Sequence, residues 1–448
     1  MSENNKIKKV MFAFGTRPEA IKMPPLNWKS LFLSMNYFLK LIFIKKKYDV
    51  VFVSSANFNR GENGENFLFN PMIEFCKNNN LSFVVFEETY FKSYSKYKIN
   101  DNAVPFDFIL IMQIILRKLF YLKYKKSSSI DDVYFRELKI SKILRSLFFK
   151  KFHSQVYITL IWSNVTLWRH INPNACIVDY QHGVICNGHE GYIKDQHPPK
   201  VKSSNNILTL VYGNPFKKIL IQNDKSGFYC EDNVITVGVN KNINTKKRID
   251  LNTKKILFTL QITPDFTKEV NEAYVKIVEN LIENNADFLT KNNYEIIFKH
   301  HPRFNTYNCP NINTKYDFIS FDNETSISDL LKSASLHMTF YSTSAFDAAT
   351  MAIPTIFVDM LEPFSPNDIF LKQYKYPCKD LTIKDYKDFR NILVSMDKKE
   401  IFSQCCDDVY LWSKEFYHDF NEVAFEDFLS NQIGAQKNVQ SNLIKNDK

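Results

Sequence analysis

The chain has no CxxC pair, no apolar run long enough to cross a membrane, and no secretory signal at its start. Its eight cysteines are scattered, and the adjacent Cys405 and Cys406 suit neither a zinc site nor a disulfide framework. No stretch reaches the roughly 18 to 20 uninterrupted apolar residues of a membrane span. The opening MSENNKIKKV lacks the basic-then-apolar form of a secretory signal. These absences predict a cytoplasmic protein in a reducing compartment.

The sequence also lacks the short motifs of several large enzyme classes. It has no GxxxxGKS/T phosphate loop, no GxGxxG fingerprint, no HExxH and no GxSxG. No DxD-type metal site is evident, and the adjacent Asp131 and Asp132 are expected to cap a helix. We therefore predict no metal and no resident cofactor. Glycine is scarce, with 10 residues of 448, and Phe, Lys, Asn and Ile are heavily used. This looks like a genome bias, so single Lys and Asn residues carry little weight.

The composition of the chain is typical of a large globular protein. Hydrophobic residues make up 45% of the chain and charged residues 24%, a balance that permits a sizeable core. A length of 448 residues is too great for one ordinary core and favours two domains. The net charge of +10 permits an anionic partner: a nucleotide phosphate, an acidic glycan, a membrane surface or nucleic acid. No basic stripe interleaved with aromatics is evident, so nucleic acid ranks last.

Two segments are rich in Phe, Ile and Leu and end in clusters of Lys or Arg. They cover residues 31–47 and 106–126. Basic apolar helices of this kind serve two uses, as amphipathic core helices with a solvated basic end or as helices that contact a membrane surface. Peripheral contact at the inner face of the membrane therefore stays open beside the core interpretation.

Short apolar runs alternate with helical stretches along the chain. Strands are predicted at residues 9–14, 49–55, 81–86, 155–162, 175–180, 207–212 and 234–239, and again at 256–260, 294–299, 318–321, 336–340 and 355–358. Helices are predicted from residue 19 and at 164–170, 267–290, 326–333 and 344–351.

The polar run at residues 240–255, dense in Lys, Asn and Thr, is predicted to be an interdomain linker. Strand and helix alternating in two blocks predict an α/β protein with two Rossmann-like domains and parallel sheets facing a cleft. The expected domains are 1–240 on the acceptor side, 256–432 for nucleotide-sugar binding, and a polar tail at 433–448. Ligands of such sheets bind beyond the carboxyl ends of the strands, so the loops after the strands are the place to search.

The string GTRPEA covers residues 15–20 and continues as IKMPPL. Gly15 allows a tight turn, Thr16 and Arg17 offer a hydroxyl and a guanidinium, and the helix N-terminus that follows favours an anion. A plain strand-to-helix turn needs Gly and Pro as well. The string resembles the opening motif of the non-hydrolysing UDP-N-acetylglucosamine 2-epimerases, whose two-domain fold is also that of the GT-B glycosyltransferases.

The other parts of an epimerase are missing. That family carries an HVEAG-like segment and a GGxQEE-like turn, whereas this chain has DYQHG at 179–183 and YSTSAFDAA at 341–349 in the corresponding places. The missing carboxylates argue against epimerase activity, which stays the alternative.

The string KHHPR at residues 299–303 follows a predicted strand. His300, His301 and Arg303 on one loop suit a phosphate cradle, with a proline fixing the turn. About 42 residues later, Ser342, Thr343 and Ser344 also follow a strand and open a helix, where hydroxyl and N–H groups bind phosphate oxygens. The bland alternatives are a core or capping histidine pair and an ordinary helix cap.

This HP loop with a downstream Ser/Thr turn is similar to the donor site of bacterial GT-B sialyltransferases, polysialyltransferases and capsule-type Kdo transferases. The resemblance implies a donor such as a CMP-sugar, with His301 and residues 342–344 on its phosphate.

The string DYQHGVI at 179–185 is followed by GHEGY at 188–192. An inverting transferase needs one base to take the proton of the acceptor hydroxyl. The candidates, in order, are His182, Glu190 and Asp179, against the alternative of a structural turn.

These patterns together predict a metal-independent glycosyltransferase of surface or capsular polysaccharide synthesis. Its partners would be a nucleotide-sugar and a glycan or lipid-linked glycan acceptor, and Arg17 could reach a phosphate or an acidic acceptor. A non-catalytic polysaccharide-assembly factor that keeps the fold without the chemistry is the third hypothesis.

Overall fold

The computed structural model describes residues 27–59, 63–88, 99–123, 130–160, 164–189, 191–239, 253–263, 266–301, 312, 315–362 and 365–433. The chain divides into two compact units. Unit 1 comprises Met1–Asn240 and His418–Lys448, and unit 2 comprises Lys241–Tyr417. The strand predicted at 9–14, the helix predicted from residue 19 and most of the predicted linker lie outside the described residues.

Unit 1 is built on a parallel sheet of seven described strands in the order β3-β2-β1-β4-β5-β6-β7. The strands are β3 (Val104–Pro105), β2 (Phe83–Glu88), β1 (Lys46–Ser55), β4 (Phe152–Thr159), β5 (Cys176–Tyr180), β6 (Leu208–Val211) and β7 (Val234–Thr236). Short β-branched and aromatic runs form them, as such runs do in sheets that are buried on both faces. The register pairs Val50 with Phe83 on one side of β1 and with Val156 on the other.

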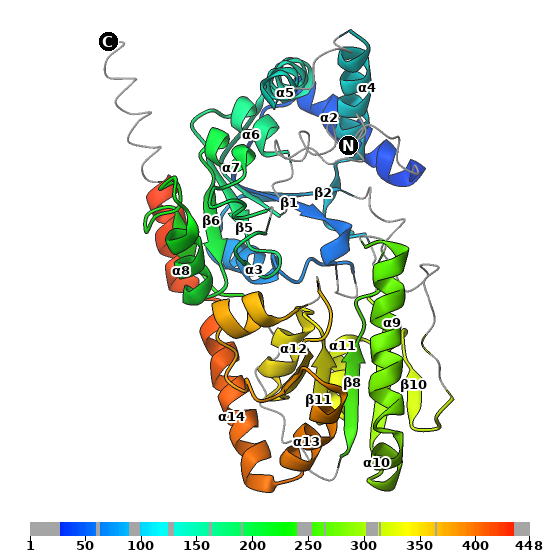
Figure 1. Ribbon diagram of the computed structural model, residues 1–448. Helices are drawn as coiled ribbons and strands as arrows, with labels where there is room; N and C mark the ends of the chain where they lie inside the picture. Colours follow the sequence, from blue (N-terminus) through cyan, green and yellow to red (C-terminus); the bar gives the residue numbers. More distant parts are fainter. Residues whose placement is uncertain are drawn as a thin grey trace. The chain divides into compact units, whose positions relative to one another are not determined.

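Helices cover both faces of this sheet. The helices are α2 (Trp28–Phe43), α3 (Asn70–Asn78), α4 (Asp107–Lys123), α5 (Ile130–Leu144), α6 (Val165–Ile171), α7 (Lys200–Asn205) and α8 (Asn214–Asn223). Figure 1 shows α2, α4, α5 and α6 on one side of β1 and β2, and α3 on the other. Successive strand side chains alternate between the faces. Val51 and Val53 accordingly join the core under α2 and α6, while Phe52 meets Phe69 at the start of α3.

Aromatic rings dominate the larger core of unit 1. Phe86 stacks on Trp168 with ring centroids 5.7 Å apart and planes at 6°, and Trp168 also stacks on Tyr157. Each such pair contributes about 0.5–1.5 kcal/mol beyond its burial. This packing gives the strand ends of unit 1 a rigid support.

Unit 2 is built on a second parallel sheet, with six described strands in the order β10-β9-β8-β11-β12-β13. The strands are β10 (Ile319–Phe321), β9 (Glu295–Lys299), β8 (Lys255–Thr259), β11 (Leu336–Thr339), β12 (Thr355–Val358) and β13 (Thr382–Ile383). The helices are α9 (Lys268–Glu283), α10 (Ala286–Lys291), α11 (Ile327–Ser333), α12 (Ser344–Thr350), α13 (Tyr386–Met396) and α14 (Lys399–Phe416). Leu257 packs with α11 and α12, whereas Tyr274 of α9 lies against Phe340 on the other face.

Two predicted helices have different ends in the structure. The single helix expected at 267–290 is two helices, because the Asn285 side chain donates to the carbonyls of Leu281 and Tyr386 and competes with the helical pattern. The helical segment expected at 31–47 ends as α2 at Phe43, and its basic end forms the start of β1, where Lys46 pairs with Phe152. The predicted helix at 106–126 is α4.

The end of the chain belongs to unit 1. His418 donates its N–H to Tyr212, Val239 donates to His418, and Phe425 packs edge-on against Phe75. The expected second domain, 256–432, therefore differs from unit 2 at its C-terminal end. The two α/β units with parallel, Rossmann-like sheets confirm the predicted fold class.

Candidate functional site

The strand order of unit 2 places several predicted site loops at one edge of the sheet. The chain leaves β8 toward β9 on one side and returns to β11 on the other, so the order of strands reverses between β8 and β11. Open parallel sheets bind ligands at the carboxyl ends of the strands beside such a reversal. The loops after β8, β9 and β11 all leave from this edge. Neighbouring strands lie about 4.8 Å apart, so the ends of β9 and β11 are roughly 10 Å apart across β8.

A buried histidine, His337, links the elements at this edge of the sheet through hydrogen bonds. His337 of β11 is fully buried, and its Nε2 lies 3.0 Å from Thr259 Oγ1 and 3.2 Å from Ser344 Oγ. Its Nδ1 lies 3.0 Å from Thr355 Oγ1. Burial lowers the pKa of His337 to about 3, so the imidazole is neutral. The ring thus joins β8, β11, β12 and α12 by uncharged hydrogen bonds.

The predicted hydroxyl trio after β11 is divided by this network. Ser344 is buried and its hydroxyl also meets Thr259 Oγ1 at 2.9 Å, so it belongs to the interior. Ser342 is half-buried and Thr343 is exposed. Gln261, in the loop after β8, accepts the N–H of Tyr341 at 2.8 Å and so anchors the start of the trio. Ser342 and Thr343 are therefore the members that a ligand can reach.

The first N–H groups of α12 are already engaged locally. Ser344 donates to Ser342 Oγ at 3.3 Å, and Ala345 and Phe346 donate to the carbonyls of Ser342 and Thr343. These three N–H groups therefore already have hydrogen-bond acceptors within the loop, contrary to the expectation that the N–H groups of this helix end would bind a phosphate. A phosphate at this loop would meet hydroxyls first.

The two histidines after β9 have different surroundings. The His300 ring stacks on Phe321 with centroids 5.6 Å apart, and burial lowers its pKa, so it is a neutral packing group. His301 is exposed. Lys299 is buried and donates to the carbonyls of Asp322 and Thr325, which ties the end of β9 to the loop after β10. Within KHHPR, His301 is thus the described side chain that faces solvent.

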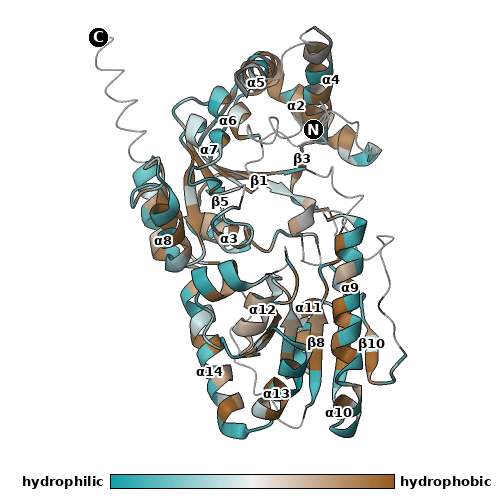
Figure 2. Cartoon of the chain, in the orientation of Figure 1, coloured by the Kyte–Doolittle hydropathy of each residue, from teal (hydrophilic) through white to brown (hydrophobic). Residues whose placement is uncertain are grey.

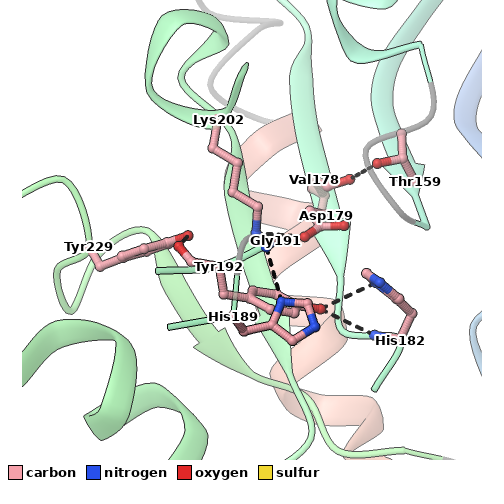
Figure 3. Close-up of polar contacts among 9 residues, drawn as sticks. All are labelled: Thr159, Val178, Asp179, His182, His189, Gly191, Tyr192, Lys202 and Tyr229. Atoms are coloured by element: carbon pink, nitrogen blue, oxygen red, sulfur yellow. Dashed lines mark hydrogen bonds and ion pairs between the residues drawn. The ribbon is translucent and has the colours of Figure 1, made fainter. Parts of the chain in front are cut away.

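Unit 1 holds a second polar site, at the end of β5. Asp179 and Lys202 of α7 form an ion pair with 2.6 Å between Oδ2 and Nζ, and both side chains are fully buried (Figure 3). Burial lowers the pKa of Lys202, and the carboxylate beside it opposes that shift. Breaking a buried pair on one side costs about 3–5 kcal/mol, because the other charge stays buried without compensation. Asp179 therefore lies in the interior, paired with the ammonium group of Lys202.

The ion pair supports a tyrosine, and the tyrosine supports His182. Lys202 Nζ lies 4.3 Å from the centre of the Tyr192 ring, a cation–π contact, and Tyr229 donates its hydroxyl to the Tyr192 carbonyl at 2.9 Å. The Tyr192 hydroxyl lies 3.2 Å from His182 Nδ1 and accepts the His182 N–H at 3.3 Å (Figure 3). Phe58 lies edge-on against the His182 ring. His182 itself is half-buried, so its ring is both oriented and accessible.

The Tyr192 hydroxyl keeps its proton over the whole neutral range. Burial raises the pKa of Tyr192 well above its usual value, and the negative charge of Asp179 raises it further. A neutral hydroxyl can accept a hydrogen bond from Nδ1–H of His182. In that tautomer Nε2 is the unprotonated nitrogen of the His182 ring.

The sequence patterns do not point to Lys202, Tyr192 or His337. Lys202 lies in the polar segment KVKSSN, which has no signal of burial, and Tyr192 is the last residue of GHEGY, where nothing marks it as a positioning group. A buried carboxyl in unit 1 was missed as well. Glu87, at the end of β2, accepts hydrogen bonds from Asn59 and Asn100, and burial raises its pKa to about 7.

Several predicted site residues lie outside the described part of the chain. They are Gly15, Thr16 and Arg17 of GTRPEA, Glu190 of GHEGY, and Arg303 of KHHPR. Of the residues that the structure describes, no group of three or more His, Cys, Asp or Glu side chains could hold a metal ion.

Several solved structures are similar to the chain over most of its length at low sequence identity. A putative UDP-N-acetylglucosamine 2-epimerase from Listeria monocytogenes is 10% identical over 87% of this chain and 97% of its own, with a TM-score of 0.49. A variant of the wall teichoic acid polymerase TagF is 12% identical over 92% and 94%, with a TM-score of 0.46. The glycotransferase of kitacinnamycin is 9% identical over 87% and 100%, with a TM-score of 0.49. No family model and no curated protein matches the chain.

Proposed function

We propose that the chain is a glycosyltransferase that moves a sugar from a nucleotide-sugar to a glycan or lipid-linked glycan acceptor. The observation that carries the proposal is the placement of His301 and of Ser342 and Thr343 in loops that leave the same sheet edge on either side of β8. An imidazole and two hydroxyls are groups that bind phosphate oxygens. The donor phosphate would lie between these loops, with the buried His337 network holding the edge rigid beneath it.

The proposed base is His182 of unit 1. In an inverting transfer, the acceptor hydroxyl gives its proton to His182 Nε2 while its oxygen attacks the anomeric carbon of the donor sugar. The bond between that carbon and the phosphate oxygen breaks, and the nucleotide leaves with the electron pair. Tyr192 would accept Nδ1–H and so keep Nε2 unprotonated and in place.

The other two candidate bases take different places in this proposal. Asp179 is buried and paired with Lys202, so it positions Tyr192 instead of meeting the acceptor. Glu190 stays a prediction, as does the role of Arg17. The identity of the nucleotide, with CMP as the first candidate from the resemblance stated above, is what the first experiment measures.

That experiment is thermal unfolding of the purified chain with CMP, CDP, UDP, GDP and UDP-N-acetylglucosamine. A nucleotide at about 100 times its Kd stabilises the protein by about 2.7 kcal/mol. We expect one nucleotide to do so, and we expect the His301→Ala and Thr343→Ala variants to lose most of the shift. Lys276→Ala, an exposed change on α9, is the matched control and should keep the shift in full.

The outcomes separate the alternatives. Stabilisation by UDP-N-acetylglucosamine alone would favour the epimerase. A nucleotide shift that survives both variants would move the donor site away from this edge. If no nucleotide shifts the transition, the donor-site proposal is wrong, and the hypothesis of a non-catalytic assembly factor is favoured.

A further inference from the structure

Helix α2 has two apolar faces, one buried within the described part of unit 1 and one that carries exposed side chains. Ser30, Ser34, Phe38 and Leu41 are buried against unit 1. The opposite face carries Trp28, Phe32, Leu39 and Phe43, which at 100° per residue fall within about 60° of one another. Trp28 is 72% exposed, Phe32 65% and Phe43 76%. A helix that only covers a core has no need of four large apolar side chains on its outer face.

The charges on the segment that carries this stripe are all of one sign. The exposed lysines of α2, of the turn after it and of the start of β1 are Lys29, Lys40, Lys45, Lys46 and Lys47. From residue 27 to residue 48 the sequence contains no Asp and no Glu. Lys29 and Lys40 lie at the border of the apolar stripe, and the other three lysines follow its C-terminal end.

The neighbouring helix repeats the pattern on a smaller scale. Helix α4 packs beside α2, where Ser34 Oγ accepts the N–H of Phe108 at 3.0 Å. On α4, Ile115 and Leu119 are exposed, with Lys118 exposed between them. Figure 2 shows hydrophobic residues over much of both helices. No helix among the described residues is long and apolar enough to cross a bilayer.

We infer that the exposed stripe of α2 docks unit 1 on an anionic membrane surface, with the helix lying in the plane of the interface. The aromatic and leucine side chains would enter the boundary between headgroups and acyl chains, and the lysines would meet lipid phosphates. A second copy of the chain fits less well, because a two-fold contact through this face would bring five lysines against five. The inference is independent of the reaction proposed above.

The test is co-sedimentation of the full chain with vesicles of phosphatidylcholine, with and without phosphatidylglycerol. We expect binding to the anionic vesicles that weakens as salt rises, and little binding to the neutral ones. The variant Phe32→Ser with Phe43→Ser should lose about ten-fold or more in binding. Lys45→Gln with Lys47→Gln should weaken binding to anionic vesicles alone. The matched control is Leu411→Ser with Val394→Ser, two exposed apolar residues of unit 2, which should bind as the native chain does.

All the changed side chains are exposed, so each variant should fold as the native chain does. Circular dichroism and the thermal transition check this. Equal sedimentation of native chain and Phe variant would overturn the inference. A native dimer that the Phe variant converts to a monomer, without vesicle binding, would assign the stripe to self-association instead. Nucleotide binding should be the same in all four proteins, so failure here is distinguishable from failure of the donor-site proposal.

Discussion

At the scale of single residues, unit 1 offers a histidine whose position is set by a buried charge that it does not touch. Asp179 holds Lys202, Lys202 lies under the Tyr192 ring, and Tyr192 contacts both the backbone and the ring of His182. The chain of contacts predicts separate effects for the proposed base, His182, and for Tyr192, which orients it.

We expect His182→Ala to lower turnover by about 10²–10⁴-fold, the usual contribution of a positioned base. Tyr192→Phe keeps the ring over Lys202 and removes only the hydroxyl, so it should lower kcat by about ten-fold with little change in KM. Release of nucleotide from the donor identified by thermal shift is the measurement. His197→Ala, an exposed histidine of the same segment, is the control. A Tyr192→Phe enzyme with native kcat would show that the hydroxyl has no part in positioning the base.

At the scale of elements, His337 joins three strands and a helix at the edge where we place the donor. Its neutral ring satisfies hydroxyls from β8, β12 and α12, so protonation would put an uncompensated charge in the interior. The donor loops would then lose their common support.

The pH dependence follows from the depressed pKa of His337, about 3 in the folded chain against 6.5 in the unfolded one. Its contribution to stability is present above pH 6.5 and is lost as the pH falls toward the folded pKa, because the unfolded state then binds the extra proton. Between pH 7 and pH 5 the loss is about 2 kcal/mol. Urea unfolding of unit 2 should show it, and His337→Gln, although less stable at pH 7, should lack this part of the slope. His301→Ala should keep the slope, and a native chain with no slope would contradict the assignment.

At the scale of the whole molecule, the chain crosses from unit 1 to unit 2 and returns. Residues 418–433 rejoin unit 1 through the N–H of Val239, which donates to His418, and through Phe425 on Phe75. Gly238 makes the close approach possible, since its φ is +78° and a Cβ there would lie 2.1 Å from the Asp419 carbonyl oxygen. Only glycine fits such a position.

Gly238→Ala should therefore destabilise unit 1 by more than backbone strain alone, through displacement of the returning segment. Gly227→Ala is the matched control, because Gly227 has a φ of +71° but nothing within 4 Å of its added Cβ. We expect about 1–3 kcal/mol for the control and a larger loss for Gly238→Ala, with the unit 2 transition unchanged. Equal losses in the two variants would mean that the returning segment moves aside without cost. Denaturant unfolding followed separately for each unit makes the measurement.

Local sequence patterns predict the two α/β blocks and most of their strands. β12 has the predicted bounds, and β1, β2, β5, β8 and β9 agree within a few residues, because a buried strand is a local run of β-branched and aromatic side chains. The same locality explains why the break between α9 and α10 was missed, since Asn285 interrupts the helix through a contact with Tyr386, far along the chain. His182 and His301 could be proposed as site residues from their motifs. The sequence did not, however, predict which of the proposed side chains are accessible to a ligand.

The burial of polar residues depends on the tertiary structure. It buries Asp179 against Lys202 and Ser344 against His337, it stacks the half-buried His300 on Phe321, and it returns residue 418 onward to unit 1. The physical reason is that strand order and long-range packing set the burial of a polar group and the partner that compensates it. Neither is written in the residues on either side of it. The local sequence around a histidine at a strand end is the same whether its ring is exposed to solvent or stacked on a phenyl ring.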